Sequence, residues 1–428
     1  MTGFNPTRLI RRFSLLIAIV LGLATRAFAV AGVSSPSFED FDRRAKAGER
    51  LSVVFFGASL TWGANASDPQ LTSYRAIIAQ RLEAAYPTAR FKFWDAAIGG
   101  TSSQLGVFRF ERDVLRRKPD LVFLDFTAND GIGDSNPETL ASYESLVRRI
   151  IQDARAPVVQ VVFPFMWDVQ RGNTDGFTRQ AAHHAISRAY HTAIGDAVVL
   201  CQQHVKSGEI PLQKLWPFDG VHPGDAGYAV FADAAWQALQ DAIKAKQACA
   251  VPAKTMYSDT YMKNARVRIS SLGALPDGWR VGVPNPVSAY FDMLMSRWLD
   301  DEVIASRKQN TADAVAPLKV KFSGSMVMLF GESTTKSVKY RALIDGKVVE
   351  HKSNDGKQTL TEFDGGLLAN IVKGNCHHAQ IIAEGLDPTR EHTLEIQPIF
   401  SGEAEQELRL ESICVAGGEA RVTLLTDK

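Results

Sequence analysis

Short apolar runs alternate with longer helical patterns along the first part of the chain, from Leu51 to about Lys246. Strands that are buried on both faces read as nearly continuous apolar runs, and their alternation with helices is typical of a parallel sheet. We therefore predict an α/β domain in which helices cover both faces of a parallel sheet. The expected strands are 51–56, 91–97, 121–126 and 158–163, and the expected helices are 38–46, 71–86, 137–154, 178–190 and 225–245.

The pattern changes after Lys246. Residues 247–255 contain a cysteine, a proline and small side chains, which suits a linker. Further on, apolar and polar residues alternate with a period of two, and Asp345-Gly346 is a hairpin signal. These features predict a C-terminal antiparallel β-sandwich. The alternating runs are 318–322, 338–344, 392–396 and 408–413, and residues 290–306 are expected to be helical.

The N-terminus has the features of a signal peptide. Arg8, Arg11 and Arg12 precede an apolar stretch from Phe13 to Ala24, and Ala27-Phe28-Ala29 fits a cleavage site. A stretch of twelve residues is too short to span a bilayer. We expect the mature protein to begin near Val30, to be exported to the periplasm or the extracellular space, and to have no integral membrane segment.

The composition and the absence of known cofactor motifs argue against several classes of function. The chain is 45% hydrophobic and 22% charged, with a formal net charge of +1, so nothing indicates a nucleic-acid partner. No phosphate loop, dinucleotide fingerprint or H-E-x-x-H helix is present, and no metal or organic cofactor is expected. Export permits disulfides, and Cys201–Cys249 and Cys376–Cys414 are possible pairs, although four buried free thiols are an equal alternative.

Ser59 follows the first predicted strand, where a parallel sheet displays its ligand-binding residues. A serine hydroxyl becomes nucleophilic when a base takes its proton. His222 is the candidate base, and Asp219, three residues earlier, can hold the other ring nitrogen. The simpler alternatives are a helix-capping role for Ser59 and an Asx-turn role for Asp219.

An oxyanion hole must meet the negative charge that develops on the carbonyl oxygen. The candidate donors are the backbone N–H groups of Ser59 and Gly100 and the side-chain amide of Asn129. Glycine suits position 100 because no β-carbon blocks the approach of a substrate. Trp62 and Trp167 lie beside these motifs and are candidate substrate-binding platforms, although packing roles are equally compatible with the sequence.

Four motifs in this order resemble the SGNH (GDSL-like) hydrolase family, over roughly residues 51–245. They are Gly57-Ala58-Ser59-Leu60-Thr61, Ala97-Ile98-Gly99-Gly100-Thr101-Ser102, Phe126-Thr127-Ala128-Asn129-Asp130 and Asp219-Gly220-Val221-His222-Pro223. The family often has aspartate where this chain has Ala58. The resemblance implies a three-layer, flavodoxin-like hydrolase domain in which Ser59, Asp219 and His222 are catalytic and Ser59, Gly100 and Asn129 form the oxyanion hole.

The sequence therefore predicts a signal peptide at 1–29, an SGNH hydrolase domain at 30–250, and a β-sandwich of carbohydrate-binding or jelly-roll type at 256–428. The family acts on esters, and export together with the appended sandwich favours an O-acetylated carbohydrate over another small ester substrate. The alternatives are a lipolytic esterase or thioesterase, a glycan O-acetyltransferase, and a glycan-binding protein with an eroded hydrolase domain.

Overall fold

A parallel sheet of five strands forms the centre of the first region, in the order β2-β1-β3-β4-β5. This is the doubly wound order of flavodoxin-like folds. Four of the strands coincide with the predicted ones. The fifth, β5, was not predicted because it is only four residues long and contains one glycine. The strands are β1 (Arg50–Gly57), β2 (Arg90–Ala97), β3 (Leu121–Leu124), β4 (Val158–Val162) and β5 (Ala193–Asp196).

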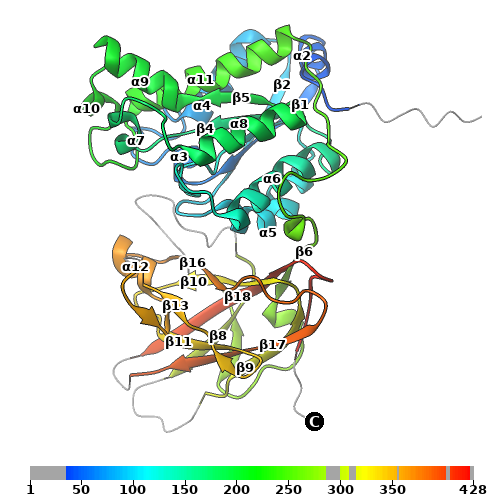
Figure 1. Ribbon diagram of the computed structural model, residues 1–428, viewed down its shortest axis with the longest axis vertical. Helices are drawn as coiled ribbons and strands as arrows, with labels where there is room; N and C mark the ends of the chain where they lie inside the picture. Colours follow the sequence, from blue (N-terminus) through cyan, green and yellow to red (C-terminus); the bar gives the residue numbers. More distant parts are fainter. Residues whose placement is uncertain (1–34, 286–298, 308–314, 354–355, 402–404, 425–428) are drawn as a thin grey trace, which may run out of the picture. The chain divides into compact units, whose positions relative to one another are not determined.

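Helices cover this sheet in two groups. The long helix α11 packs on β5, α4 and α9, whereas α5 packs on α6, and Figure 1 shows the sheet between α11 and the α5–α6 pair. The predicted three-layer α/β/α fold is therefore confirmed. The helices are α2 (Phe38–Lys46), α3 (Ser59–Trp62), α4 (Tyr74–Ala85), α5 (Ser103–Asp113), α6 (Pro137–Gln152), α7 (Met166–Gln170), α8 (Thr178–Tyr190), α9 (Ala197–Ser207), α10 (Leu212–Leu215) and α11 (Asp225–Lys244).

Two antiparallel sheets follow, in the orders β16-β10-β18-β8-β7 and β12-β11-β17-β9-β19, and they enclose a second apolar core. This confirms the predicted β-sandwich. The elements are β6 (Asn264–Arg268), β7 (Trp279–Gly282), β8 (Glu302–Arg307), β9 (Leu318–Ser323), β10 (Met326–Ser333), β11 (Lys339–Ile344), β12 (Lys347–Val348), β13 (His351–Lys352), β14 (Thr359–Leu360), β15 (Phe363–Asp364), α12 (Leu367–Val372), β16 (Cys376–Ala383), β17 (Glu391–Ile399), β18 (Gln406–Ala416) and β19 (Arg421–Leu424).

The computed structural model describes residues 35–285, 299–307, 315–353, 356–401 and 405–424. The predicted signal peptide lies outside the described residues. The helix expected at 290–306 lies outside the described residues as far as 298. Its last part is wrong, because Glu302–Arg307 form β8, paired with β7 and β18. All four cysteines are buried free thiols. Among the described residues, no helix combines the length and apolar character that a bilayer crossing requires.

The outer face of one sandwich sheet packs on the α/β region. Met326, Met328 and Phe330 of β10 belong to the apolar core of that region, whereas Val327 and Leu329 belong to the sandwich core. Polar contacts join the same two parts, since Gln104 Nε2 on α5 lies 2.7 Å from Tyr261 Oη. The described residues from Pro36 onward accordingly form one compact unit.

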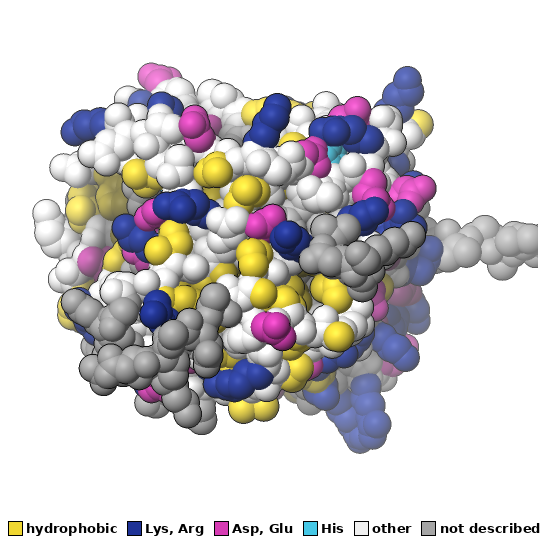
Figure 2. All heavy atoms as spheres, turned by 90° about the horizontal axis from the view of Figure 1, so that it is seen from below, with side chains coloured by type: hydrophobic (Ala, Val, Ile, Leu, Met, Phe, Trp, Pro, Cys, Tyr) yellow, Lys and Arg dark blue, Asp and Glu magenta, His cyan; other side chains and the backbone are white. Residues whose placement is uncertain are grey.

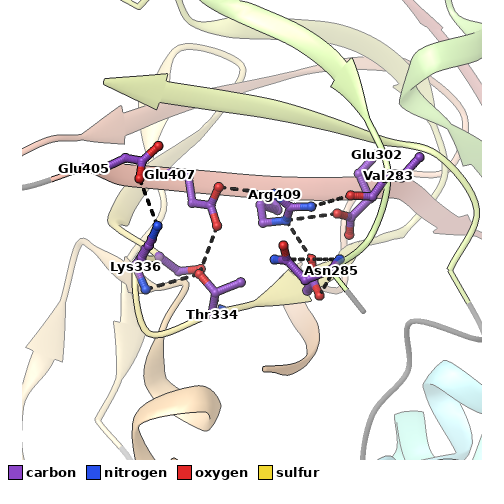
Figure 3. A network of polar contacts seen from close by, with 10 residues as sticks. Val283, Asn285, Glu302, Thr334, Lys336, Glu405, Glu407 and Arg409 are labelled. Atoms are coloured by element: carbon purple, nitrogen blue, oxygen red, sulfur yellow. Dashed lines mark hydrogen bonds and ion pairs between the residues drawn. The ribbon is translucent and has the colours of Figure 1, made fainter. Parts of the chain in front are cut away.

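A buried polar network ties three sandwich strands to the segment after β7 (Figure 3). The Arg409 guanidinium on β18 donates to the carboxylates of Glu302 and Glu332 and to the Val283 carbonyl. The Asn285 backbone also donates to Glu332. Burial and the neighbouring Glu332 raise the pKa of Glu302. This rise reflects the cost of ionising a buried carboxyl beside a second carboxylate, which the Arg409 guanidinium offsets only in part.

Charged side chains of both signs are interspersed on the face of the molecule seen in Figure 2, with apolar side chains between them. Pairs such as Lys321–Glu391, 2.8 Å apart, bridge β9 and β17 at the surface. Exposed pairs of this kind contribute only about 0–1 kcal/mol each. Surface pairs of this kind therefore add little to the stability of the sandwich.

Candidate active site

Ser59 is the first residue of α3, directly after β1 ends at Gly57. Its Oγ lies 3.0 Å from His222 Nε2, and the residue is only 4% exposed. The N-cap position of α3 is occupied by Ala58, which makes no side-chain capping bond. Ser59 therefore does not take the helix-capping role that was its simpler alternative.

A hydrogen bond to Asp125, which follows β3, stabilises the turn that carries Ser59. Thr61 Oγ1 donates to Asp125 Oδ2 over 2.8 Å, and burial raises the pKa of this carboxyl to about 7. Glycine is needed at position 57, because a β-carbon there would collide with Thr61 Oγ1 and the Asp125 carbonyl. The Thr61–Asp125 contact gives the turn a support that Ala58 cannot provide.

His222 and Asp219 occupy the loop before α11. His222 Nδ1 lies 3.4 Å from Asp219 Oδ2, while Asp219 Oδ1 accepts the backbone N–H groups of Val221 and His222, both at 2.7 Å. Asp219 therefore forms the Asx turn considered above and also faces the histidine ring. One carboxylate oxygen orders the loop and the other is directed toward the imidazole.

Electrostatics keep His222 neutral near pH 7. Burial lowers the pKa of His222, and the Asp219 carboxylate offsets only part of that effect. Burial raises the pKa of Asp219, but hydrogen bonds from the backbone N–H groups of His222 and Val221 and from Asn65 outweigh it, so the net pKa is lowered. The pair is thus a neutral imidazole beside an ionised carboxylate, which is the state that a general base requires.

The candidate oxyanion donors come from three segments, which are the start of α3 and the loops after β2 and β3. Gly100 has φ +70°, a left-handed conformation that favours glycine. Asp130 Oδ1 accepts the N–H of Ser103, the first residue of α5, over 2.9 Å, and so ties the Asn129 loop to the Gly100 loop. Gly100 and Asn129 line one cavity of about 310 Å³. The structure therefore places both candidate donors at the same hollow.

The sandwich supplies the other wall of this cavity. Leu367 of α12 and His377 and Gln380 of β16 line it together with Gly100 and Asn129. Sequence reasoning missed these three residues, because no local pattern connects them with motifs more than 200 positions earlier. A second groove, of about 850 Å³, adjoins this cavity and extends over the hairpin of β13 and β14. The groove and the cavity share the lining residues Asp364, Leu367 and Gln380.

The two predicted tryptophans are not among the residues that line this cavity. Trp167 is 48% exposed and packs against Gly220 in the loop of Asp219. Trp62 is half-buried, and its carbonyl accepts a bond from Arg75. Phe218, immediately before Asp219, is 76% exposed and was overlooked. Its position beside the candidate motif of Asp219 and His222 was the signal available in the sequence.

The pH dependence of ester hydrolysis should follow His222. Only the neutral imidazole accepts a proton, and burial lowers its pKa, so activity should persist below pH 6.5 and fall as the pH drops through the lowered value. The measurement is kcat/KM for p-nitrophenyl acetate between pH 4 and 8, with circular dichroism at each pH as the control for folding. An acid limb with its midpoint above 6.5, or full activity at pH 4, would contradict the assignment.

Comparisons with known proteins bear on the family and the fold. Residues 55–230 match the model of the GDSL-like Lipase/Acylhydrolase family. A two-domain esterase (CEX) active on acetylated mannans, co-crystallised with mannopentaose, superposes with a TM-score of 0.70 at 23% identity, covering 89% of this chain and 95% of that chain. Another structure of a two-domain CEX esterase active on acetylated mannans gives 0.68 at 24% identity, with the same coverage. This likeness is one of fold. No curated protein matches the chain.

Proposed function

Because residues 55–230 form a GDSL-like lipase/acylhydrolase domain, the domain of a carboxylic ester hydrolase, we propose that this protein removes O-acetyl groups from a carbohydrate outside the cytoplasm. The observation that carries the proposal is the alignment of Ser59, His222 and Asp219. Ser59 Oγ lies 3.0 Å from one imidazole nitrogen, and Asp219 lies 3.4 Å from the other.

In the first step Ser59 Oγ attacks the acetyl carbonyl carbon and passes its proton to His222 Nε2. This requires the tautomer with hydrogen on Nδ1, which Asp219 favours by accepting it. The carbonyl oxygen becomes an oxyanion held by the N–H groups of Ser59 and Gly100 and by the Asn129 amide. Collapse of this intermediate breaks the ester bond, and His222 returns the proton to the departing sugar oxygen. Water then hydrolyses the acetyl-enzyme, with His222 again as base.

The residues that line the cavity of Gly100 and Asn129 favour a carbohydrate substrate. Polar side chains such as His377 and Gln380 share the cavity with Leu105, Leu367 and other apolar ones. The adjoining groove is bordered mainly by polar and charged side chains, whereas a long acyl chain would need an apolar channel. The esterase of similar fold acts on acetylated mannans, and we extend that class, an acetylated polysaccharide, to this chain.

The test compares p-nitrophenyl acetate, butyrate and octanoate, followed by acetate release from an acetylated polysaccharide, using the protein from residue 30 onward. We expect the acetyl ester to be preferred, and acetate to be released from the polymer only by a protein with intact Ser59. A preference for octanoate would indicate a lipolytic esterase. Absence of Ser59-dependent turnover on all substrates would leave a transferase or a glycan-binding protein.

A further inference from the structure

We propose that Asn65 is a positioning residue for this reaction, which holds the Asp219 carboxylate in the orientation that His222 needs; the proposal rests on the function proposed above. Asn65 Nδ2 donates to Asp219 Oδ2 over 2.7 Å and lies 3.4 Å from the His222 carbonyl oxygen. Oδ2 is the same oxygen that faces His222 Nδ1. Asn65 belongs to none of the four motifs that indicated the site.

The Asp219 side chain needs such a support because it is 44% exposed. Its Oδ1 is held by two backbone N–H groups, but its contact with His222 Nδ1 is long, at 3.4 Å. Without a second donor, Oδ2 would be open to water. The Asn65 amide fixes the second oxygen, so that the carboxylate plane is set before a substrate arrives and the imidazole can shorten its bond during the reaction.

The backbone explains why asparagine stands here. Asn65 has φ +67°, in the left-handed region where asparagine and glycine are the usual residues. It lies two residues after Gly63, which ends the helix that begins with Ser59. Tyr228 Oη donates to the carbonyl of Ala64 over 2.6 Å, which anchors the turn on α11. The turn that presents Ser59 thus also presents the amide that holds Asp219.

Other contacts hold this loop independently of Asn65. The Ser67 backbone N–H and hydroxyl donate to the two Asp225 oxygens over 2.8 and 2.6 Å, and Thr72 Oγ1 donates to Asp225 over 2.8 Å. Asp225 is the first residue of α11, just beyond His222. Removing the Asn65 amide should therefore leave the loop in place and change only the support of Asp219.

The experiment uses Asn65→Gly, since glycine accepts φ +67° without strain and only the amide is lost. Ser67→Ala is the matched control in the same loop, where it removes a contact to Asp225 and none to Asp219. For each variant we would measure kcat and KM for p-nitrophenyl acetate, the thermal unfolding temperature, and the pKa of the His222 imidazole by NMR titration. The NMR titration does not depend on turnover.

We expect Asn65→Gly to lower kcat about tenfold or more with little change in KM, because orientation of the base is lost rather than substrate binding. The His222 pKa should fall below that of the wild type, because Asp219 is the charge that raises it. Asn65→Asp, which adds a carboxylate beside Asp219, should raise the His222 pKa instead. Ser67→Ala should leave kcat and the His222 pKa unchanged.

An unchanged His222 pKa and unchanged kcat in a folded Asn65→Gly protein would overturn the proposal, even if the unfolding temperature fell, since that result describes a purely structural turn residue. If Asn65→Gly lowers the His222 pKa but the protein shows no Ser59-dependent turnover, the positioning role of Asn65 stands. The proposed esterase function is then wrong.

Discussion

Replacing Ser59 by alanine is expected to reduce kcat for p-nitrophenyl acetate by about 10⁴–10⁶-fold, since residues that act as a nucleophile–base unit lose nearly all of their contribution together. Ser59 Oγ lies 3.0 Å from His222 Nε2, and no acyl-enzyme can form on this serine without that oxygen. His222→Ala should cause a similar loss. The double variant Ser59→Ala/His222→Ala should be no slower than either single variant.

The control for this cycle is Ser207→Ala at the exposed end of α9, where the hydroxyl donates to the His204 carbonyl and accepts the Glu209 N–H. It should retain wild-type kcat. If the losses from Ser59→Ala and His222→Ala multiplied in the double variant, the two residues would be acting independently, and the proposed proton transfer between them would be wrong.

Asn129→Ala is expected to lower kcat by about 10²–10³-fold while KM changes little, because an oxyanion donor acts on charge that exists only in the transition state. Asn129 lies on the loop after β3, and it lines the same cavity as Gly100. Steady-state kinetics with p-nitrophenyl acetate give both constants. Circular dichroism would verify that the variant is folded.

A matched control is Asn173→Ala, which removes an exposed side-chain amide whose oxygen accepts the Asp175 N–H. It should not change either constant. A result in which Asn129→Ala raises KM and leaves kcat unchanged would place Asn129 in ground-state binding of the substrate, and the oxyanion assignment would then fail.

Strands could be predicted from the sequence where elements of the same region bury them. β1 and β4 are buried on both faces by helices from the same region, and their apolar runs identified them. β10 is buried along its whole length as well, but it lies in the antiparallel sandwich, where one polar face was expected. Its second face packs on the core of the α/β region, so no alternation marks it. Burial against a distant part of the chain cannot be read from local periodicity.

In the candidate site, too, local features could be predicted from the sequence and contacts between distant segments could not. The sequence by itself determined that Ser59 follows a buried strand and that Asp219 lies three residues before His222, because strand endings and short loops are local properties. Only the tertiary structure decided that His222 reaches Ser59 across 163 positions, that Asn65 holds Asp219, and that Gln380 of the sandwich lines the cavity of Asn129. These contacts arise from the packing of segments far apart in the chain, and no spacing or composition within one segment encodes them.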